Sequence, residues 1–214
     1  MPTLVKRKTD KMNTQKLKII ADGSIIAIAN TKKYNETLIN QTNWTWRQFN
    51  NFILETNKDN LIVFDTSCEN EWTIEFLINS ETDKAYFRKV EQSIAVTDQK
   101  LYLINWTDLT SSLQFKDTKL PDEINKDLKI DLENGFYKVV VKQLFNSEDH
   151  EYISENKISF IVEFIIQSEN PKIKADSIIW TENFPNDETC FLNDEPNEFD
   201  DFLKNLLEKD KNQQ

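Results

Sequence analysis

Segments in which apolar and polar residues alternate are the feature that most limits what this 214-residue chain can fold into. In EWTIEFLI (71–78), every second residue from Trp72 to Ile78 is apolar, and the opposite face carries Glu71, Thr73 and Glu75. A period of two residues is that of a β-strand with one buried face. KISFIVEFIIQ (157–167) carries apolar residues on both faces, which predicts a central strand covered on both sides.

Other segments extend this pattern along the chain. Short apolar runs separated by turn residues are LIVFDTS, AYFRKVEQSIAV, KLYLINW and GFYKVVVKQLF. Asp22-Gly23 lies between two β-branched runs, where glycine supplies the positive φ of a tight hairpin turn. Roughly seven short strands with few long helical patterns predict an all-β fold, an antiparallel β-sandwich.

Two segments have the helical period instead. Apolar residues recur at i, i+3 and i+7 from Trp46 to Ile53, which predicts a short helix near residues 45–55. A C-terminal amphipathic helix is predicted by the apolar stripe of Phe199, Phe202, Leu203, Leu206 and Leu207. We therefore expect three regions: a basic, flexible N-terminus over 1–15, a β-sandwich domain over 16–182, and an acidic loop with the C-terminal helix over 183–214.

The residue inventory excludes several kinds of active site. Gly23 and Gly135 are the only glycines, so glycine-rich nucleotide loops are excluded, and the single His150 excludes multi-histidine zinc sites. Cys68 and His150 would make a nucleophilic pair only through the fold, and no catalytic signature surrounds them. Cys68 and Cys190 are far apart, as in proteins of a reduced compartment. We expect no cofactor and no bound metal.

Localisation is read from the same sequence. The N-terminal residues contain no apolar segment before a small-residue cleavage site, and no apolar run has the length of a membrane span. We therefore expect a cytoplasmic protein. The five tryptophans are expected mainly in the core, and Trp44, which precedes the predicted helix, is the best candidate for exposure.

The charge distribution indicates what the chain binds. Its 37 acidic and 26 basic residues give a net charge of -11, and the first 18 residues are basic, so the remainder is still more negative. Such a surface repels nucleic acid and anionic membranes and attracts basic proteins. The densest acidic segment carries Asp187, Glu188, Asp194, Glu195, Glu198, Asp200 and Asp201.

Several interpretations of this acidic segment stay open. Glu198, Asp200 and Asp201 fall in the first turn of the predicted helix, where the helix dipole favours carboxylates. The other four form either a solvated loop or a phosphate-mimicking surface for a basic partner. Calcium binding is a further alternative, but NDEPNEFDD lacks the spacing and the glycine of an EF-hand loop. Carboxylate pairs for glycoside hydrolysis carry no weight in so acidic a chain.

Three strand motifs resemble those of a known group of proteins. They are Val90-Glu91 with Ser93, Asn105-Trp106, and the Gly135–Val141 segment with its alternating Gly, Tyr and Val residues. Together the strands resemble a loose family of bacterial β-sandwich proteins that includes the competence nuclease inhibitor and related toxin-immunity proteins. The resemblance covers about half of the chain. It implies the fold more than the partner, because the shared residues are packing positions.

The sequence thus predicts an acidic, non-enzymatic binding protein, an inhibitor or immunity protein that occludes a basic nuclease or another bacterial toxin. The expected contact residues are Asp187, Glu188, Asp194, Glu195, Glu198, Asp200, Asp201 and Trp44. The main alternative is a carbohydrate- or lipid-binding sandwich that uses one sheet face, and a hydrolase that uses carboxylates is a third. The partner's identity and the oligomeric state are left open by the sequence.

Overall fold

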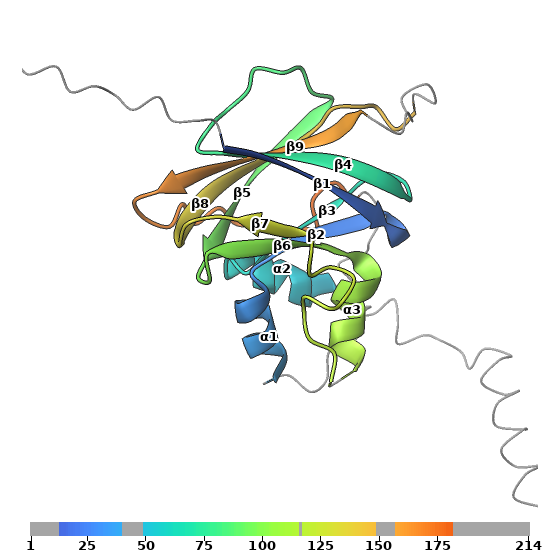
Figure 1. Cartoon of the computed structure of the whole chain (residues 1–214), viewed down its shortest axis with the longest axis vertical. Helices are drawn as coiled ribbons and strands as arrows, with labels where there is room; N and C mark the ends of the chain where they lie inside the picture. The colour runs from blue at the N-terminus through green and yellow to red at the C-terminus, as the bar shows by residue number, and fades with distance from the viewer. Residues whose placement is uncertain (1–12, 40–48, 116, 149–156, 182–214) are drawn as a thin grey trace, which may run out of the picture. The chain divides into compact units, whose positions relative to one another are not determined.

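Nine strands and four helical segments are present in the part of the chain that the computed structural model describes, residues 13–39, 49–115, 117–148 and 157–181 (Figure 1). In chain order they are β1 (Asn13–Ala21), the 3-10 turn η1 (Asp22–Ser24), β2 (Ile25–Ala29), α1 (Thr31–Ile39), α2 (Phe49–Asn57), β3 (Leu61–Asp65), β4 (Asn70–Ile78), β5 (Arg88–Val96), β6 (Lys100–Asn105), α3 (Trp106–Gln114), β7 (Lys129–Asp131), β8 (Gly135–Gln143) and β9 (Ile158–Gln167).

The strands form two sheets. The outer sheet has five strands in the order β1-β4-β9-β8-β5, and the inner sheet has four in the order β3-β2-β6-β7. The inner sheet lies between the outer sheet and the three α-helices (Figure 1). The expectation of a mostly β fold is confirmed. The expectation that all strands pair antiparallel is wrong, because β4 and β9 are parallel.

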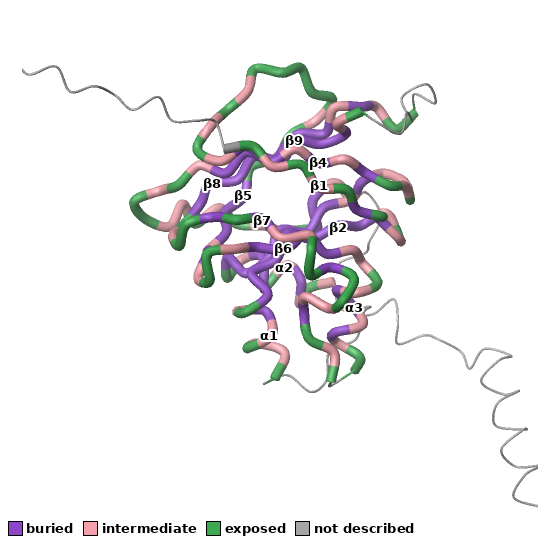
Figure 2. Tube along the Cα trace, in the orientation of Figure 1, coloured by how far each residue is buried: buried purple, intermediate pink, exposed green. Residues whose placement is uncertain are grey.

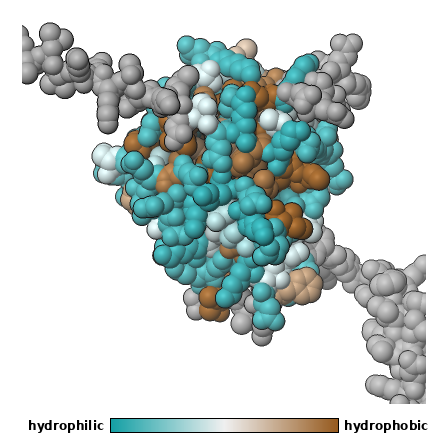
Figure 3. Space-filling model, in the orientation of Figure 1, coloured by the Kyte–Doolittle hydropathy of each residue, from teal (hydrophilic) through white to brown (hydrophobic). Residues whose placement is uncertain are grey.

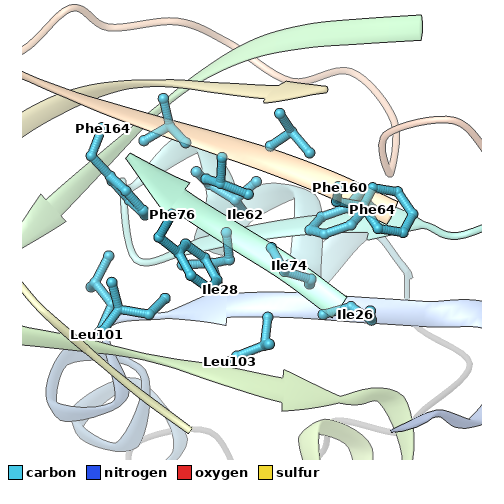
Figure 4. Close-up of a cluster of buried hydrophobic side chains, with 14 of the residues drawn as sticks. Ile26, Ile28, Ile62, Phe64, Ile74, Phe76, Leu101, Leu103, Phe160 and Phe164 are labelled. Atoms are coloured by element: carbon cyan, nitrogen blue, oxygen red, sulfur yellow. The ribbon is translucent and has the colours of Figure 1, made fainter. Parts of the chain in front are cut away.

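The first core fills the space between the two sheets. Trp72, Ile74 and Phe76 of β4 are buried there, as their alternation predicts, and Phe160 and Phe164 of β9 pack with them. Figure 4 shows these rings facing isoleucines and leucines of β2, β3 and β6. β9 is the middle strand of the outer sheet, which confirms the prediction of a central strand.

A second core fills the space between the inner sheet and the helices. All five residues of β2 are buried, with Ile26 and Ile28 in the first core and Ala27 in the second. Tyr34 of α1 and Phe52 of α2 cover this second face. Burial is therefore concentrated along the inner sheet, and Figure 2 shows this as purple segments in the middle layer.

The helical layer is larger than the sequence predicts. α2 (Phe49–Asn57) confirms the helix expected near residues 45–55 over the part that is described. α1 and α3 were not predicted, because their sequences TKKYNETLI and WTDLTSSLQ are rich in threonine and polar residues. α3 begins at a capping residue: the Asn105 side chain accepts a hydrogen bond from the Asp108 N–H at 2.8 Å.

Asp22-Gly23 does not form the predicted hairpin. β1 pairs with β4 in the outer sheet and β2 pairs with β3 and β6 in the inner sheet, so the η1 turn carries the chain from one sheet to the other. Gly23 has a φ of 64°, as a turn glycine should. A Cβ at Gly23 would also lie 3.1 Å from a Trp106 ring atom, so the crossing requires glycine on both grounds.

Several expectations fall outside the described residues: the C-terminal helix, His150, Cys190, Trp44 and Trp46. The division into the regions 1–15, 16–182 and 183–214 also remains a prediction. In the described part of the chain, every helix is too short and too polar to span a lipid bilayer.

A buried ion pair fixes the loop between β4 and β5, which arches over the outer sheet (Figure 1). Lys142 Nζ of β8 lies 2.6 Å from Glu163 Oε1 of β9, and the two side chains are 8% and 2% exposed. Both groups also bind the backbone of Thr82: Lys142 donates to its carbonyl at 2.7 Å, and its N–H donates to Glu163 at 2.8 Å. The pair therefore holds the loop at one point.

Removing one member of this pair should be costly. We expect Lys142→Met to lower the free energy of unfolding by about 3 to 5 kcal/mol, because Glu163 is left charged and buried. The double variant Lys142→Met with Glu163→Leu should recover most of that loss, since no unpaired charge remains. Urea unfolding measures both values.

The matched control is Lys18→Met, which breaks the pair with Glu71 in which both side chains are 51% exposed. It should cost less than about 1 kcal/mol. Equal losses for Lys142→Met and Lys18→Met would show that the buried pair has no special role.

Candidate functional site

The residues behind the family resemblance have packing roles. Ser93 is buried, and its hydroxyl donates to Asp59 Oδ1 at 2.5 Å, which joins β5 to the start of β3. Trp106 stacks on Phe49 of α2 with ring centroids 5.7 Å apart. Tyr137 lies in the first core, and its hydroxyl donates to the Glu133 carbonyl. These motifs stabilise the fold and do not form a reactive site.

The predicted contact residues cannot be placed by the structure. The acidic segment with Asp187, Glu188, Asp194, Glu195, Glu198, Asp200 and Asp201, as well as Trp44, lies outside the described residues. Among the residues that are described, no three Asp, Glu, His or Cys side chains gather closely enough to hold a metal ion. Other charged residues, far apart in the sequence, are brought together by the described part of the fold.

Four carboxylates from distant parts of the sequence lie on or beside the η1 turn and the start of α3, which contact each other. They are Asp22, Glu69, Asp108 and Asp122, which we call the acidic corner. Asp22 Oδ1 accepts from the Thr107 N–H at 3.4 Å, and Glu69 Oε1 accepts from the Gly23 N–H at 3.0 Å. The crossing between the sheets thus positions the first two carboxylates next to the helix that carries the third.

Asn125 joins the remaining two carboxylates. Its side chain is fully buried, and Nδ2 donates to Asp108 Oδ2 at 2.6 Å and to Asp122 Oδ1 at 2.7 Å. Asp122 Oδ1 also accepts from the backbone N–H groups of Ile124 and Asn125. A neutral amide therefore brings two negative groups together without cancelling their charge.

The acidic corner differs from the other carboxylates on the sheets. On the outer sheet, lysine and glutamate are paired across neighbouring strands: Lys16–Glu75, Lys18–Glu71, Lys138–Glu91 and Lys142–Glu163. In contrast, none of the lysines and arginines in the described ranges forms an ion pair with Asp22, Glu69, Asp108 or Asp122. The corner thus concentrates negative charge that the described part of the chain does not neutralise.

The pKa of Asp108 shows the energetic consequence. Partial burial raises the pKa of this carboxyl above its ordinary value, and repulsion from Asp122 and Asp22 raises it further. The hydrogen bonds from Asn125 and Asn105 act in the opposite direction, and the net direction is upward. The folded chain therefore holds Asp108 in a place where its negative charge is unfavourable, and a cation brought to the corner would relieve that cost.

The sequence did not predict this corner. Its members lie at positions 22, 69, 108 and 122, and only the pairing of the strands and the fold of the 115–128 segment bring them together. A weak local signal does exist for Asp108, which follows the Asn105 cap at the third position of a helix, where acidic residues are favoured. This signal identifies Asp108 only when a helix is already predicted to begin at Trp106, and the sequence did not predict α3.

Cys68 has no sign of reactivity. Burial raises the pKa of its thiol, and the nearby carboxylate of Asp65 raises it further, so the thiolate is disfavoured. Its side chain packs against the first core. The suggested partner, His150, lies outside the described residues.

Replacement of Asp108 should reveal the strain directly. The folded-state pKa is above the ordinary aspartate value of 3.8, so the folded chain binds the proton more tightly than the unfolded chain does. The wild type is therefore destabilised by this group at neutral pH, and the penalty disappears as the pH falls through the folded pKa towards 3.8.

We expect Asp108→Asn to be more stable than the wild type at neutral pH by roughly a few tenths of a kcal/mol, because water screens a half-buried group. The difference should vanish in acid. Urea unfolding at several pH values measures this, and Asp131→Asn is the control, because Asp131 is 67% exposed and paired with Lys129. A loss of stability at neutral pH for Asp108→Asn would contradict the assignment.

Similarity to known proteins concerns the fold. No family model matches the chain, and no curated protein matches it in sequence. The solved structure of "Crocagin biosynthetic gene J" is 9% identical, with a TM-score of 0.51, and the alignment covers 73% of this chain and 99% of that one. The structure of ComJ, an inhibitor of the DNA-degrading activity of NucA from Bacillus subtilis, is 16% identical, with a TM-score of 0.45 and the same coverages. ComJ is therefore among the similar solved structures, as the resemblance predicts, and at these identities both similarities concern the fold alone.

Proposed function

We propose that this chain is an acidic, non-enzymatic inhibitor or immunity protein that binds a basic protein, a nuclease or another toxin, and blocks its active cleft. The observation that carries the proposal is the acidic corner: four carboxylates are brought together without an ion pair to any described lysine or arginine. In the rest of the described chain, lysines are available and pair with glutamates. A surface that keeps its negative charge is suited to a cationic partner.

The energetics of the corner support the same proposal. Clustered like charges reduce the stability of the free protein, as the raised pKa of Asp108 indicates. Residues that reduce stability in this way are typical of functional surfaces, where binding compensates for the cost. Long-range attraction between the corner and a basic protein would also increase the rate of association.

The predicted acidic segment extends this proposal beyond the described residues. Asp187, Glu188, Asp194, Glu195, Glu198, Asp200 and Asp201 would add to the negative field, and Trp44 would add apolar contact. The chain as a whole would then resemble a nucleic acid in charge and compete with it for the basic cleft of a nuclease.

The tryptophans give little support to the alternative of a sugar-binding face. Trp72 is 2% exposed and stacks on Phe145 in the first core. Trp106 stacks on Phe49, and Trp180 is covered by the guanidinium of Arg88 at 4.4 Å from the ring centroid. Each of these three rings packs against another side chain of the protein, so its stacking face is not open to a sugar.

Charge reversal at the corner tests the proposal. The triple variant Asp22→Lys, Asp108→Lys and Asp122→Lys should weaken inhibition of any basic nuclease that is found encoded beside this gene by at least about a hundredfold, since each lost charge contact costs on the order of 1 kcal/mol or more. Cleavage of a fluorescent DNA substrate provides the readout, and circular dichroism verifies that the variant is folded.

The matched control reverses charges that are already paired, Glu71→Lys and Glu75→Lys on the outer sheet. This variant should inhibit within about threefold of the wild type, because these carboxylates are already paired with Lys16 and Lys18. Equal inhibition by the corner variant and the wild type, or no inhibition of any neighbouring nuclease by the wild type, would refute the proposed function.

A further inference from the structure

The face of the outer sheet that points away from the inner sheet is electrically balanced. Its strands carry the four lysine–glutamate pairs described above, each with one positive and one negative group. The β4–β5 loop adds Glu81, Asp83 and Lys84, and Lys89 of β5 adds a second positive charge, so these four charges cancel. The guanidinium of Arg88 does not add to this face, because it lies over Trp180, which packs against the first core. On a chain with a net charge of -11, this face has no net charge among the described residues.

The same face exposes large apolar side chains. Ile20 of β1 is 65% exposed, and Phe136 of β8 is 39% exposed. Both point away from the first core, because their strand neighbours Ile19 and Tyr137 point into it. In the loop, Tyr86 and Phe87 are 44% and 51% exposed, and they form what we call the aromatic ridge. Figure 3, in which the two stacked sheets are seen from the side, shows apolar side chains at the surface among hydrophilic ones.

The aromatic ridge is held in place before anything binds to it. On one side, Thr82 is bonded to the buried Lys142–Glu163 pair through both its N–H and its carbonyl. On the other side, the Phe87 N–H donates to the Gln143 carbonyl at 2.8 Å. The Tyr86 ring also lies near the ammonium groups of Lys89 and Lys142, at 5.5 and 5.9 Å. Exposed aromatic residues on a fixed loop lose little entropy on binding and are typical anchors of protein interfaces.

Charge decides which partner fits this face. A strongly basic protein is attracted to the acidic corner and gains nothing from a balanced surface. A second copy of this chain is repelled by every surface that keeps its negative charge, and it can approach closely only where the charges cancel. A balanced patch is also self-complementary, since the solvent-accessible lysines Lys16, Lys18 and Lys138 can face carboxylates of the other copy across a two-fold axis.

We infer that the outward face of the outer sheet binds a second copy of this chain, with Tyr86 and Phe87 at the centre of a two-fold contact. The acidic corner stays outside this contact, because its unpaired carboxylates would repel their equivalents in the other copy. The acidic corner adjoins the β1 edge of this sheet, whereas the aromatic ridge directly precedes β5 at the opposite edge. Self-association is therefore centred away from the corner, and its inference does not rest on the proposed inhibition.

Sedimentation velocity on the full chain, from low to high micromolar concentration, tests this inference. We expect a concentration-dependent dimer in the wild type and at least about tenfold weaker association in the double variant Tyr86→Asp with Phe87→Asp, since the loss of two anchors costs more than 1.4 kcal/mol. Leu54→Asp on α2 is the matched control, because Leu54 is 52% exposed on the helical layer. It should dimerise as the wild type does.

The effect of salt distinguishes self-association from the proposed binding of a basic nuclease. Added salt screens the repulsion between two negative copies, so the dimer should become stronger, whereas binding of a basic nuclease should become weaker. Thermal unfolding shows whether the aspartate variants are folded. If the aspartate variants do not fold, hydrogen exchange of the wild type is measured instead. The backbone amides of residues 83–87 should then exchange more slowly at high protein concentration than at low concentration.

Three results would overturn the inference. The wild type could sediment as a monomer at every concentration, the folded loop variant could associate as strongly as the wild type, or Leu54→Asp could weaken the dimer as much as the loop variant does. In the hydrogen-exchange experiment, the inference would also be overturned if the protection of residues 83–87 did not depend on protein concentration.

Discussion

The inner sheet carries apolar side chains on both faces, and the need to bury both faces organises the described part of the molecule. All five residues of β2 are buried, and β3 is buried over four of its five residues. One face is covered by the outer sheet and the other by the three helices. The η1 turn at Gly23 is the consequence, because it carries the chain from the covering sheet into the covered one.

This layering also separates the charges. The outer sheet presents its lysines and glutamates in cross-strand pairs, so one side of the molecule is balanced. The sheet crossing and the start of α3 instead bring Asp22, Glu69 and Asp108 together with Asp122, and no described cation pairs with them. Two surfaces with different chemistry result. We propose the first for a cationic protein and the second for another copy of the chain.

Much of the fold followed from local patterns, but the site did not. The alternation in β4 and β9 identified the strands, their buried faces and the central position of β9. The parallel pairing of β4 with β9 joins residues about 85 positions apart, and no short-range sequence pattern predicts it. α1 and α3 were missed because few of their residues are apolar, and packing against the inner sheet outweighs their weak propensity. The acidic corner depends on all of these long-range features, so a sequence with 37 acidic residues could not single it out.

The ionisation of Asp108 tests the central claim most directly, since that claim is that the corner's uncompensated charge is directed at a cationic partner. Carboxyl chemical shifts of Asp108, followed through a pH titration of the free chain and of its complex with a basic nuclease, give its pKa in both states. Positive groups placed against the corner should lower the pKa from its raised value in the free chain. A pKa that is unchanged or higher in the complex would show that the partner binds elsewhere.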